Sequence, residues 1–391
     1  MKIIWVVKKQ FDISVSSVSR VEIIKALETG NHQILLLAGF RDNKPILNLN
    51  GKIRYVKLGK SKFFSSLVFD LLAFFNIAYY LIFKNVDFII IESTAWLVSL
   101  PFVILRKLQL ISTRLVLDVR TLPVEVFGIT NKLKESLFHV SIRSAKFLFD
   151  GITVITPFMK KYFINKYNLG NRKIGIWTSG VCIDTFNPER VSPANIELLR
   201  EELALKDKFI IMYHGVLTPT RGLKETIEAI NLLANKYPDI IFLLIGDGIA
   251  ATELDNSINY LKLKNRVIIK ASVPYKKIPS YIALADVGIV PLPRILWWRV
   301  SCPIKLMEYL AMQKPVIVTD IEAHQDILDS DNCGIFIPSH HPEAIAQGIV
   351  KAYRKRKHLK QMGRQGRIIV QENYTWKKQA VKLENYLNSI F

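Results

Sequence analysis

The chain has 391 residues, half of them apolar, and a formal net charge of +21 at pH 7. Its length exceeds what one compact core usually fills, and its apolar content is enough to bury two cores, so we expect two globular domains. The three cysteines, Cys182, Cys302 and Cys333, form no C-x-x-C pair, which argues against a disulfide framework and a zinc site and favours a reducing compartment.

The positive charge is concentrated in the first half of the chain. Residues 1–190 contain 27 basic and 13 acidic side chains, a net charge of +14. Such a field attracts polyanions, which include nucleic acids, sugar nucleotides and acidic membrane surfaces. Charge alone does not choose between these partners.

Short apolar runs separated by helix-length segments recur along the chain, which is typical of buried parallel strands in β-α repeats. The first run is too short for a signal-peptide core and predicts a strand instead. In the first half we expect strands at Ile3–Val7, Ile34–Ala38, Phe88–Ile91, Leu115–Leu117, Ile152–Ile155 and Ile174–Trp177. In the second half we expect them at Phe209–Tyr213, Ile240–Ile245, Val267–Ile269, Val287–Val290, Pro315–Thr319 and Gly334–Ile337. Two sets of six strands predict an α/β fold with two doubly wound, Rossmann-like domains.

The apolar segment Phe63–Phe83 is long enough to span a bilayer, and its only charge is Asp70. A span would place the first strands of a parallel sheet and their partners on opposite sides of the membrane, a topology that is hard to build. Three alternatives follow: a helix packed on the sheet, an interfacial helix lying on a membrane, and a true span.

A segment with two prolines and no strand pattern, Phe186–Leu199, separates the two sets of strands and indicates a linker. We therefore expect an N-terminal domain of residues 1–190 and a second domain of residues 191–372. The last helix, in residues 373–391, follows the final helix of the second sheet and is not needed to cover that sheet. We expect it to cross back and pack on the first domain.

Four sequence blocks follow the linker. The expected strand Phe209–Tyr213 is followed by HGVLTPTRGL. This sequence has a glycine after the strand, then a basic residue and a second glycine at the start of a helix. Such a pattern lets backbone N–H groups and a fixed cation approach a phosphate group. Alone, this block also fits an ordinary strand-to-helix turn. The other blocks are FLLIGDGIAATEL from Phe242, VPYKKIPSYIALADVGIVPL from Val273, and SCPIKLMEYLAMQKPVIVTD from Ser301.

Together, the order and spacing of these blocks resemble those of the GT4 family of retaining glycosyltransferases, a group 1 family with the two-domain GT-B fold. The segments LDVRTLP, GITVITPFMKKY, SGVCIDTFNP and YTWKKQAVKLENYL fit the family less specifically. The resemblance implies that the N-terminal domain binds the acceptor, that the second domain binds the nucleotide sugar, and that the final helix crosses back.

In this family two basic residues neutralise the diphosphate of the donor as the glycosidic bond breaks, and usually no metal takes part. The resemblance implies these catalytic roles for Arg221 and Lys305, and it implies that Glu308 accepts hydrogen bonds from the donor ribose. It also implies donor contacts at Gly215, Gly222, Gly246, Val273, Cys302, Pro303 and Leu306. We therefore expect a nucleotide-diphosphate sugar as substrate and no metal or other cofactor.

The sequence departs from the family pattern at three positions. Val216 stands where an arginine is common, and Arg221 stands where lysine is common, which keeps the charge but changes the hydrogen-bond geometry. Val300 replaces the first glutamate of the E-x7-E pattern, which contacts the donor sugar. A subgroup with P-x-K-x-x-E matches better, through Pro303, Lys305 and Glu308.

In the first domain, Asp118 and Arg120 end a strand on the side where ligands bind in doubly wound sheets. By resemblance to relatives with a D-x-R sequence, Asp118 is a catalytic candidate that orients or deprotonates the acceptor hydroxyl; a structural cap is the alternative. Arg120 and Ser17 are weaker candidates for the acceptor side.

The resemblance implies a retaining transferase of hexosyl or N-acetylhexosaminyl type that moves a sugar from a nucleotide-diphosphate sugar to an acceptor hydroxyl. A lipid-linked glycan in surface polysaccharide or glycoconjugate biosynthesis is the expected acceptor. The basic first half and the segment Phe63–Phe83 favour a cytoplasmic protein with peripheral contact to an anionic membrane, without nucleic acid as a partner. The alternatives are a sugar-nucleotide epimerase or hydrolase of the same fold, and a non-catalytic membrane-binding partner subunit, which Val216 and Val300 keep open.

Overall fold

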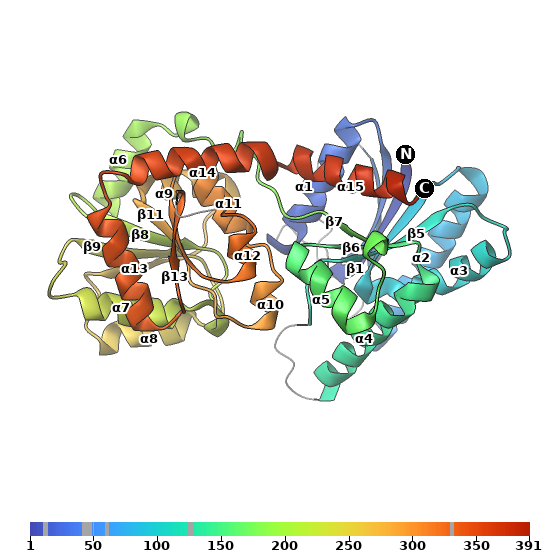
Figure 1. The fold of residues 1–391 in the computed structure, drawn as a ribbon, viewed down its shortest axis with the longest axis horizontal. Helices are drawn as coiled ribbons and strands as arrows, with labels where there is room; N and C mark the ends of the chain where they lie inside the picture. The colour runs from blue at the N-terminus through green and yellow to red at the C-terminus, as the bar shows by residue number, and fades with distance from the viewer. Residues whose placement is uncertain (11–14, 41–48, 50, 59–61, 124–128, 329–331) are drawn as a thin grey trace. The chain divides into compact units, whose positions relative to one another are not determined.

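The computed structural model describes the chain except for residues 11–14, 41–48, 50, 59–61, 124–128 and 329–331. The chain divides into two compact units (Figure 1). The first comprises residues 1–179 and 376–391, and the second comprises residues 180–375. Each unit is built on a parallel β-sheet with helices packed against it, so the expected α/β architecture is confirmed.

Among the described residues, the first unit has a seven-stranded parallel sheet in the order β3-β2-β1-β4-β5-β6-β7. Its strands are β1 (Lys2–Gln10), β2 (Gln33–Phe40), β3 (Lys52–Lys57), β4 (Phe88–Glu92), β5 (Arg114–Val119), β6 (Gly151–Val154) and β7 (Ile174–Ile176). The strand order reverses at β1, where Ile3 pairs with Ile34 on one side and with Phe88 on the other. Ligands of doubly wound sheets bind at such a reversal, beyond the carboxyl ends of the strands.

Strand β3 is not among the predicted strands. Its sequence, KIRYVK, alternates basic with apolar residues, and the strand lies at the edge of the sheet with Lys52 and Lys57 exposed. Buried parallel strands are recognised by a continuous apolar run, whereas edge strands carry charges that discourage further pairing. The rule that finds the other strands therefore misses this one.

The helices of the first unit are α1 (Val15–Thr29), α2 (Lys62–Phe83), α3 (Leu100–Lys107), α4 (Ile129–Leu148), α5 (Pro157–Tyr167) and α15 (Trp376–Ser389), with 3-10 turns η1 (Ser93–Ser99) and η2 (Asn171–Lys173). Helix α2 contacts β1, β3 and η1, and Asp70 forms an ion pair of 2.6 Å with Lys8 of β1. Because β1 pairs directly with β4, the strands before and after α2 belong to one sheet. Helix α2 therefore packs on this sheet and does not separate its strands as a span would.

Helix α15 packs against α1 and β7 of the first unit, as the sequence predicts for the final helix. The Tyr386 hydroxyl donates a hydrogen bond to the carbonyl of Lys173 at 2.5 Å and accepts one from the Ile152 amide at 3.1 Å. A Cβ on Gly175 would overlap the Tyr386 ring, so the ring can lie on β7 only because this residue is glycine.

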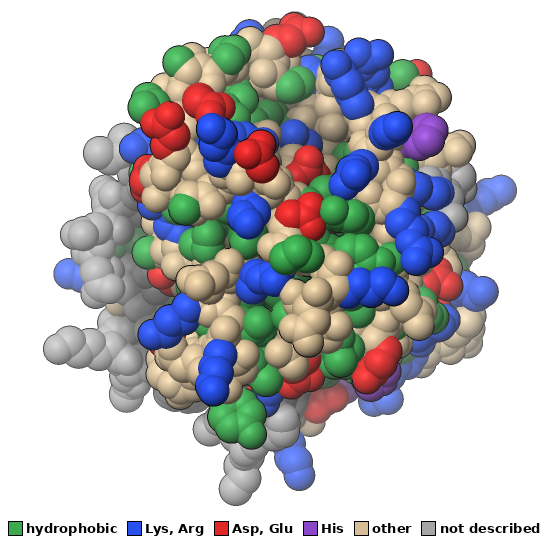
Figure 2. Space-filling view, turned by 90° about the vertical axis from the view of Figure 1, so that its left-hand side faces the viewer, with side chains coloured by type: hydrophobic (Ala, Val, Ile, Leu, Met, Phe, Trp, Pro, Cys, Tyr) green, Lys and Arg blue, Asp and Glu red, His purple; other side chains and the backbone are tan. Residues whose placement is uncertain are grey.

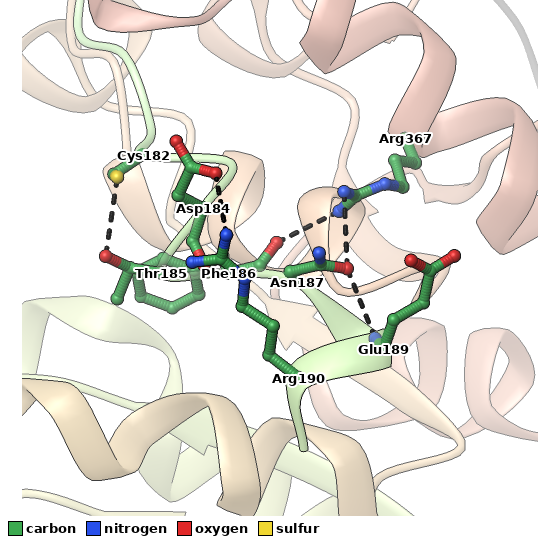
Figure 3. A network of polar contacts seen from close by, with 8 residues as sticks. All are labelled: Cys182, Asp184, Thr185, Phe186, Asn187, Glu189, Arg190 and Arg367. Atoms are coloured by element: carbon green, nitrogen blue, oxygen red, sulfur yellow. Dashed lines mark hydrogen bonds and ion pairs between the residues drawn. The ribbon is translucent and has the colours of Figure 1, made fainter.

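The boundary between the units differs from the expected one. Residues 180–190 belong to the second unit, not to the first, because Val181 pairs with Thr375 and Phe186 is buried against Tyr275. Arg367 reaches this segment from α14 (Leu359–Asn373) and donates to the Phe186 carbonyl at 3.0 Å (Figure 3). The start of the proline-containing segment is therefore anchored in the second unit through Phe186, whereas the residues that follow it are half-buried or exposed.

The second unit has, within its described residues, a six-stranded parallel sheet in the order β10-β9-β8-β11-β12-β13, and all six predicted strands are confirmed. They are β8 (Phe209–His214), β9 (Ile240–Ile245), β10 (Val267–Lys270), β11 (Val287–Val290), β12 (Val316–Thr319) and β13 (Gly334–Ile337).

The helices of the second unit are α6 (Pro193–Glu202), α7 (Leu223–Leu233), α8 (Ala251–Tyr260), α9 (Ile278–Leu284), α10 (Leu296–Arg299), α11 (Ile304–Ala311), α12 (Glu322–Gln325), α13 (Pro342–Arg354) and α14, with 3-10 turns η3 (Pro188–Arg190), η4 (Pro219–Arg221) and η5 (Tyr275–Lys277). Helices α7, α8 and α13 bury their apolar faces with β8 and β9 in one core cluster. On the surface of this unit at the left of Figure 1, basic, acidic and apolar side chains are interspersed (Figure 2).

Substitution of Gly175 by alanine should destabilise the first unit, because the new methyl group would force the Tyr386 ring off β7. Overpacking of this kind costs about 1–3 kcal/mol, which lowers a melting temperature by several degrees. Differential scanning calorimetry measures the effect. The matched control is Gly170→Ala, since a Cβ there meets nothing within 4 Å. Equal melting temperatures for the two variants would contradict the proposed close packing of α15.

Candidate functional site

The second unit gathers polar residues where β8 and β9 end. Strand β8 ends at His214 and continues into Gly215, and β9 ends just before Gly246. Gly246 and Gly222 both have positive φ, and a Cβ on either would overlap a backbone carbonyl, that of Gly215 or that of Pro291. The loops can therefore approach each other this closely only with glycine. Gly222 and Gly246 are buried in these contacts, whereas Gly215 is half-buried at the carboxyl end of the sheet.

Lys305 is the central cation of this site. It lies in the first turn of α11 with 9% of its surface exposed, and its Nζ is 3.6 Å from the centroid of the Tyr213 ring. Its Nζ has no hydrogen-bond partner among the described residues, and it lies 3.0 Å from where a Cβ of Gly215 would be. Burial, with a smaller contribution from the Arg221 charge, holds the pKa of Lys305 well below its ordinary value, whereas Glu308 opposes this shift.

Glu308 lies one turn further along α11 and is also buried. Its Oε1 accepts a hydrogen bond of 2.7 Å from the Tyr275 hydroxyl, and its Oε2 is 3.3 Å from Nε2 of His214, without hydrogen-bond geometry. Burial raises the pKa of Glu308 to about 7, although the Tyr275 hydrogen bond and the Lys305 charge both favour the ionised form. Burial and then the Lys305 charge hold the pKa of His214 well below 6.5, so its imidazole is neutral at neutral pH.

Arg221 supplies a second cation beside Lys305. It ends η4 just before Gly222, and its Nε donates a hydrogen bond of 3.3 Å to the Thr218 hydroxyl. Its guanidinium carbon is 5.0 Å from the centroid of the Trp298 ring, and the indole N–H of Trp298 donates to the carbonyl of Thr220 at 2.8 Å. The aromatic ring and the hydroxyl hold the guanidinium while leaving donors for a ligand.

Helix α11 points its N-terminus into the same region. Pro303 is the N-cap residue, and no side chain caps this end. The first backbone N–H groups of a helix lack partners within it, and the positive end of the helix dipole favours an anion. Backbone donors, Lys305 and Arg221 thus converge on one place, where together they can bind a group that carries more than one negative charge.

Of the predicted donor-binding residues, Gly215, Gly222, Gly246, Pro303 and Glu308 lie at this site together with the two cations. The side chains of Cys302 and Leu306 are buried in the core of the unit, so only their backbone atoms are available to a ligand. Val273 is half-buried in the loop before η5. The roles of all these residues remain predictions.

His214 and Tyr275 belong to the site but are absent from the predicted set. His214 ends an apolar strand on the ligand-binding side of a doubly wound sheet, a signal that could have identified it. Tyr275 contacts Glu308 across 33 positions of sequence, and nothing in its local sequence indicates that contact.

The predicted acceptor-side residues belong to the first unit, and Asp118 is the most buried of those whose side chains are described. Asp118 is 0% exposed, and its Oδ1 accepts a hydrogen bond of 2.8 Å from the Thr153 hydroxyl of β6. Burial raises the pKa of Asp118, opposed first by Arg120 and then by Arg20. Complete burial and a bond to the neighbouring strand favour the structural alternative for Asp118 over direct contact with an acceptor.

Arg120 is better placed than Asp118 to meet a ligand, because it is only half-buried. Its guanidinium lies 3.4 Å from the centroid of the Trp177 ring and donates to the Trp177 carbonyl at 2.6 Å. Ser17 lies in α1, and its side chain is outside the described part of the structure. Arg20 and Glu92, which pair at 2.9 Å beside Asp118, are 72 positions apart, so local sequence gave no signal for this pair.

Within the described ranges of the chain, no group of three or more His, Cys, Asp or Glu residues is placed to hold a metal ion.

Comparison with known proteins places the second unit in a family. Residues 195–368 match the family model described as "Glycosyl transferases group 1". This segment belongs to the group 1 glycosyltransferases. The group 1 domain so defined contains Arg221, Lys305 and Glu308, the residues on which the resemblance in sequence depends.

Curated relatives are more distant, and they match only in part. Alpha-D-kanosaminyltransferase of Streptomyces kanamyceticus is 26% identical over 151 residues, which cover 39% of this chain and 38% of the relative. The Bacillus subtilis protein TuaH, whose name refers to teichuronic acid biosynthesis, is 28% identical over 172 residues, 44% of this chain and 41% of the relative. The matched regions thus span less than half the length of each of these two relatives.

Solved structures match along the whole chain. Anabaena Alr3699/HepE in complex with UDP has a TM-score of 0.76 and 16% identity, with complete coverage of both chains. Identity this low shows a shared fold and nothing more. The chain has the GT-B fold, and the group 1 domain is its second Rossmann-like unit.

Replacement of Glu308 by glutamine should change how stability depends on pH. The pKa of Glu308 is raised from 4.5 to about 7 in the folded chain, so the folded state holds this proton more tightly than the unfolded state does. The wild type should therefore lose stability relative to Glu308→Gln as pH rises from 4.5 to 7, by up to about 3 kcal/mol, with little further change above 7.

Melting temperatures of the wild type and the Glu308→Gln variant, measured between pH 5 and pH 8, check this sign. His214 and Lys305 titrate in both proteins, so most of their contribution cancels in the difference. A difference that stays constant over this range would contradict the raised pKa.

Proposed function

We propose that this chain is a retaining glycosyltransferase of the GT4 type, which moves a sugar from a nucleotide-diphosphate sugar to an acceptor hydroxyl. The observation that carries this proposal is the buried Lys305 ammonium, which has no hydrogen-bond partner within the described structure and lies beside Gly215 and an uncapped helix N-terminus. A buried cation without an anion is costly, and a bound diphosphate supplies that anion.

Breaking the glycosidic bond leaves the shared electron pair on the diphosphate, so negative charge grows on its oxygens during the reaction. Arg221 and Lys305 are fixed before the reaction, and they stabilise this growing charge more than the charge of the bound donor. The first N–H groups of α11 add neutral donors to the same group. The neutral His214 beside Lys305 adds no competing charge.

Glu308 acts on the nucleoside part of the donor in this proposal. An ionised carboxylate accepts two hydrogen bonds from vicinal ribose hydroxyls. Burial raises the pKa of Glu308 to about 7, while the Tyr275 hydroxyl and the Lys305 charge favour the ionised form. Two complexes of solved structures with this fold support a nucleotide ligand but differ in the base: HepE contains UDP-glucose, and starch synthase IV of Arabidopsis thaliana contains ADP.

Val300 affects which sugar is transferred. It is buried, and a valine cannot accept hydrogen bonds from sugar hydroxyls as the glutamate of related enzymes does. We include hexoses and N-acetylhexosamines among the candidate sugars. Attack on the donor from the face that the diphosphate leaves preserves the anomeric configuration, which is the retaining outcome.

The acceptor in this proposal is a lipid-linked glycan of surface polysaccharide or glycoconjugate biosynthesis. The charge of +14 in residues 1–190 supports a location at the cytosolic face of an anionic membrane, and the name of TuaH supports a role in polysaccharide assembly. Nucleic acid, metal and other cofactors are not part of the proposal.

Arg221→Ala and Lys305→Ala should each reduce turnover roughly 100-fold or more, because a fixed donor to a developing charge contributes about 2–4 kcal/mol to the transition state. Nucleotide release from a panel of nucleotide-diphosphate sugars, with an acceptor extract, measures this turnover. Lys224→Ala is the matched control, since Lys224 is an exposed lysine close in sequence whose partner is Glu253. Near-normal turnover in either site variant would overturn its assigned role.

The same panel separates the alternatives. An epimerised sugar nucleotide or a free sugar formed without acceptor would exclude simple transfer. Calorimetric titration with UDP, ADP and GDP tests the donor site itself, and binding of none of them would favour a non-catalytic subunit. Retention is checked by the anomeric configuration of the product in NMR spectra.

A further inference from the structure

Helix α2 has apolar side chains on two faces. Towards the sheet it buries Phe69, Ala73 and Ile77, which are four residues apart. Away from the sheet it exposes Leu67, Leu71, Phe75, Tyr79 and Phe83, also four residues apart, with Ile82 beside them. Only 17% of its apolar window Ser66–Phe83 is buried. The inner face packs on the sheet, whereas the side chains of the outer face are exposed in the described part of the first unit.

Helices α3 and α4 extend this outer face. The turn η1 contacts α2, α3 and α4, and Phe74 of α2 stacks on Phe102 of α3 with 5.4 Å between ring centroids. Residues of α3 and of the end of α4 line one cavity of about 250 Å³. The exposed Phe147 is one of these lining residues. All three helices connect strands in the same direction across the sheet, so right-handed crossovers place them on one side of it (Figure 1).

The apolar side chains on this side of the unit are accompanied by charges of one sign. Exposed basic residues are Lys84, Lys107, Lys132, Lys134, Arg143 and Lys146. Over the described residues of α2, α3 and α4, the acidic side chains are Asp70, which pairs with Lys8, and Glu135, which lies 3.6 Å from His139. The face therefore combines apolar side chains with a net positive charge.

We propose that the outer face of α2, together with α3 and α4, docks on the surface of an anionic lipid bilayer. A helix of 22 residues is about 33 Å long, and its exposed apolar stripe runs from Leu67 to Phe83, so it lies flat with these side chains among the acyl chains. The lysines extend to the phosphate groups of the lipids. Two copies of the chain paired through this face would bring like charges together, which disfavours a dimer as its occupant.

This inference deepens the proposed peripheral membrane location, but its test involves no sugar transfer. Purified full-length protein is centrifuged with vesicles of phosphatidylcholine alone, or of phosphatidylcholine with about one third phosphatidylglycerol. We expect the wild type to sediment with the anionic vesicles. Leu71→Gln combined with Phe75→Gln should weaken this binding by about tenfold or more.

The matched control is Leu198→Gln combined with Leu232→Gln. These two leucines are 63% and 56% exposed in the second unit, against 55% and 58% for Leu71 and Phe75. A second pair, Lys107→Glu with Lys146→Glu, tests the charge against Lys206→Glu with Lys264→Glu in the second unit. Circular dichroism shows whether each variant is folded.

Several outcomes would overturn the proposal. The wild type could remain in the supernatant with anionic vesicles, or the α2 variant could bind them as tightly as its control. A lipid-free dimer in sedimentation velocity, dissociated by Leu71→Gln with Phe75→Gln, would show that a second copy covers this face. In each of these cases nucleotide release can still be measured, so failure here is distinguishable from failure of the proposed transfer activity.

Discussion

The buried ammonium of Lys305, which has no hydrogen-bond partner among the described residues, is the constraint on which the ligand site of the second unit depends. A cation this buried needs compensation, and the described residues around it offer the Tyr213 ring at 3.6 Å and the carboxylate of Glu308 one helical turn away. Most of the surrounding polar groups are themselves donors, such as Arg221 and the start of α11, and the histidine next to it is held neutral. The site therefore carries positive charge and hydrogen-bond donors without enough negative charge to balance them, and a bound anion with more than one negative charge supplies it.

The glycines of this site are what allow the arrangement. A Cβ on Gly215 would lie 3.0 Å from Nζ of Lys305, so its absence lets Lys305 lie close to the β8 loop. Gly246 and Gly248 bring the β9 loop against the backbone carbonyls of Gly215 and Leu217. A glycine loses more conformational entropy on folding than other residues do. In return, these glycines let one backbone segment, or a cation, approach another backbone segment closely. The first unit uses the same device for a different purpose, since Gly175 makes room for the Tyr386 ring of α15.

Much of the fold could be predicted from sequence because parallel strands buried on both faces leave continuous apolar runs. All six strands of the second unit were found in this way, whereas β3, a charged edge strand, was not. The unit boundary was misplaced because the prolines near Pro188 suggest a linker, while the burial of Phe186 depends on Tyr275 and Arg367, far away in sequence.

The same limit applies to the two sites. Arg221, Lys305 and Glu308 could be proposed as site residues by resemblance, because each lies in a contiguous block, and their roles remain predictions. The contacts of Tyr275 with Glu308 and of Arg20 with Glu92 could not, since only the folded sheets bring these residues together. The burial of Asp118 was also not evident from the sequence. Its hydrogen bond to Thr153 of the neighbouring strand favours the structural alternative over the catalytic one.

Helix α15 has one more consequence, for the order in which the units can be completed during synthesis. The second unit is a continuous segment of the chain, whereas the first unit is assembled from residues 1–179 and 376–391. A ribosome therefore releases all of the second unit before it releases Leu383 and Leu387, which the first unit buries. Until then, Gly175 of β7 lacks the Tyr386 ring that lies against it, and any truncation before Trp376 would leave the first unit without α15.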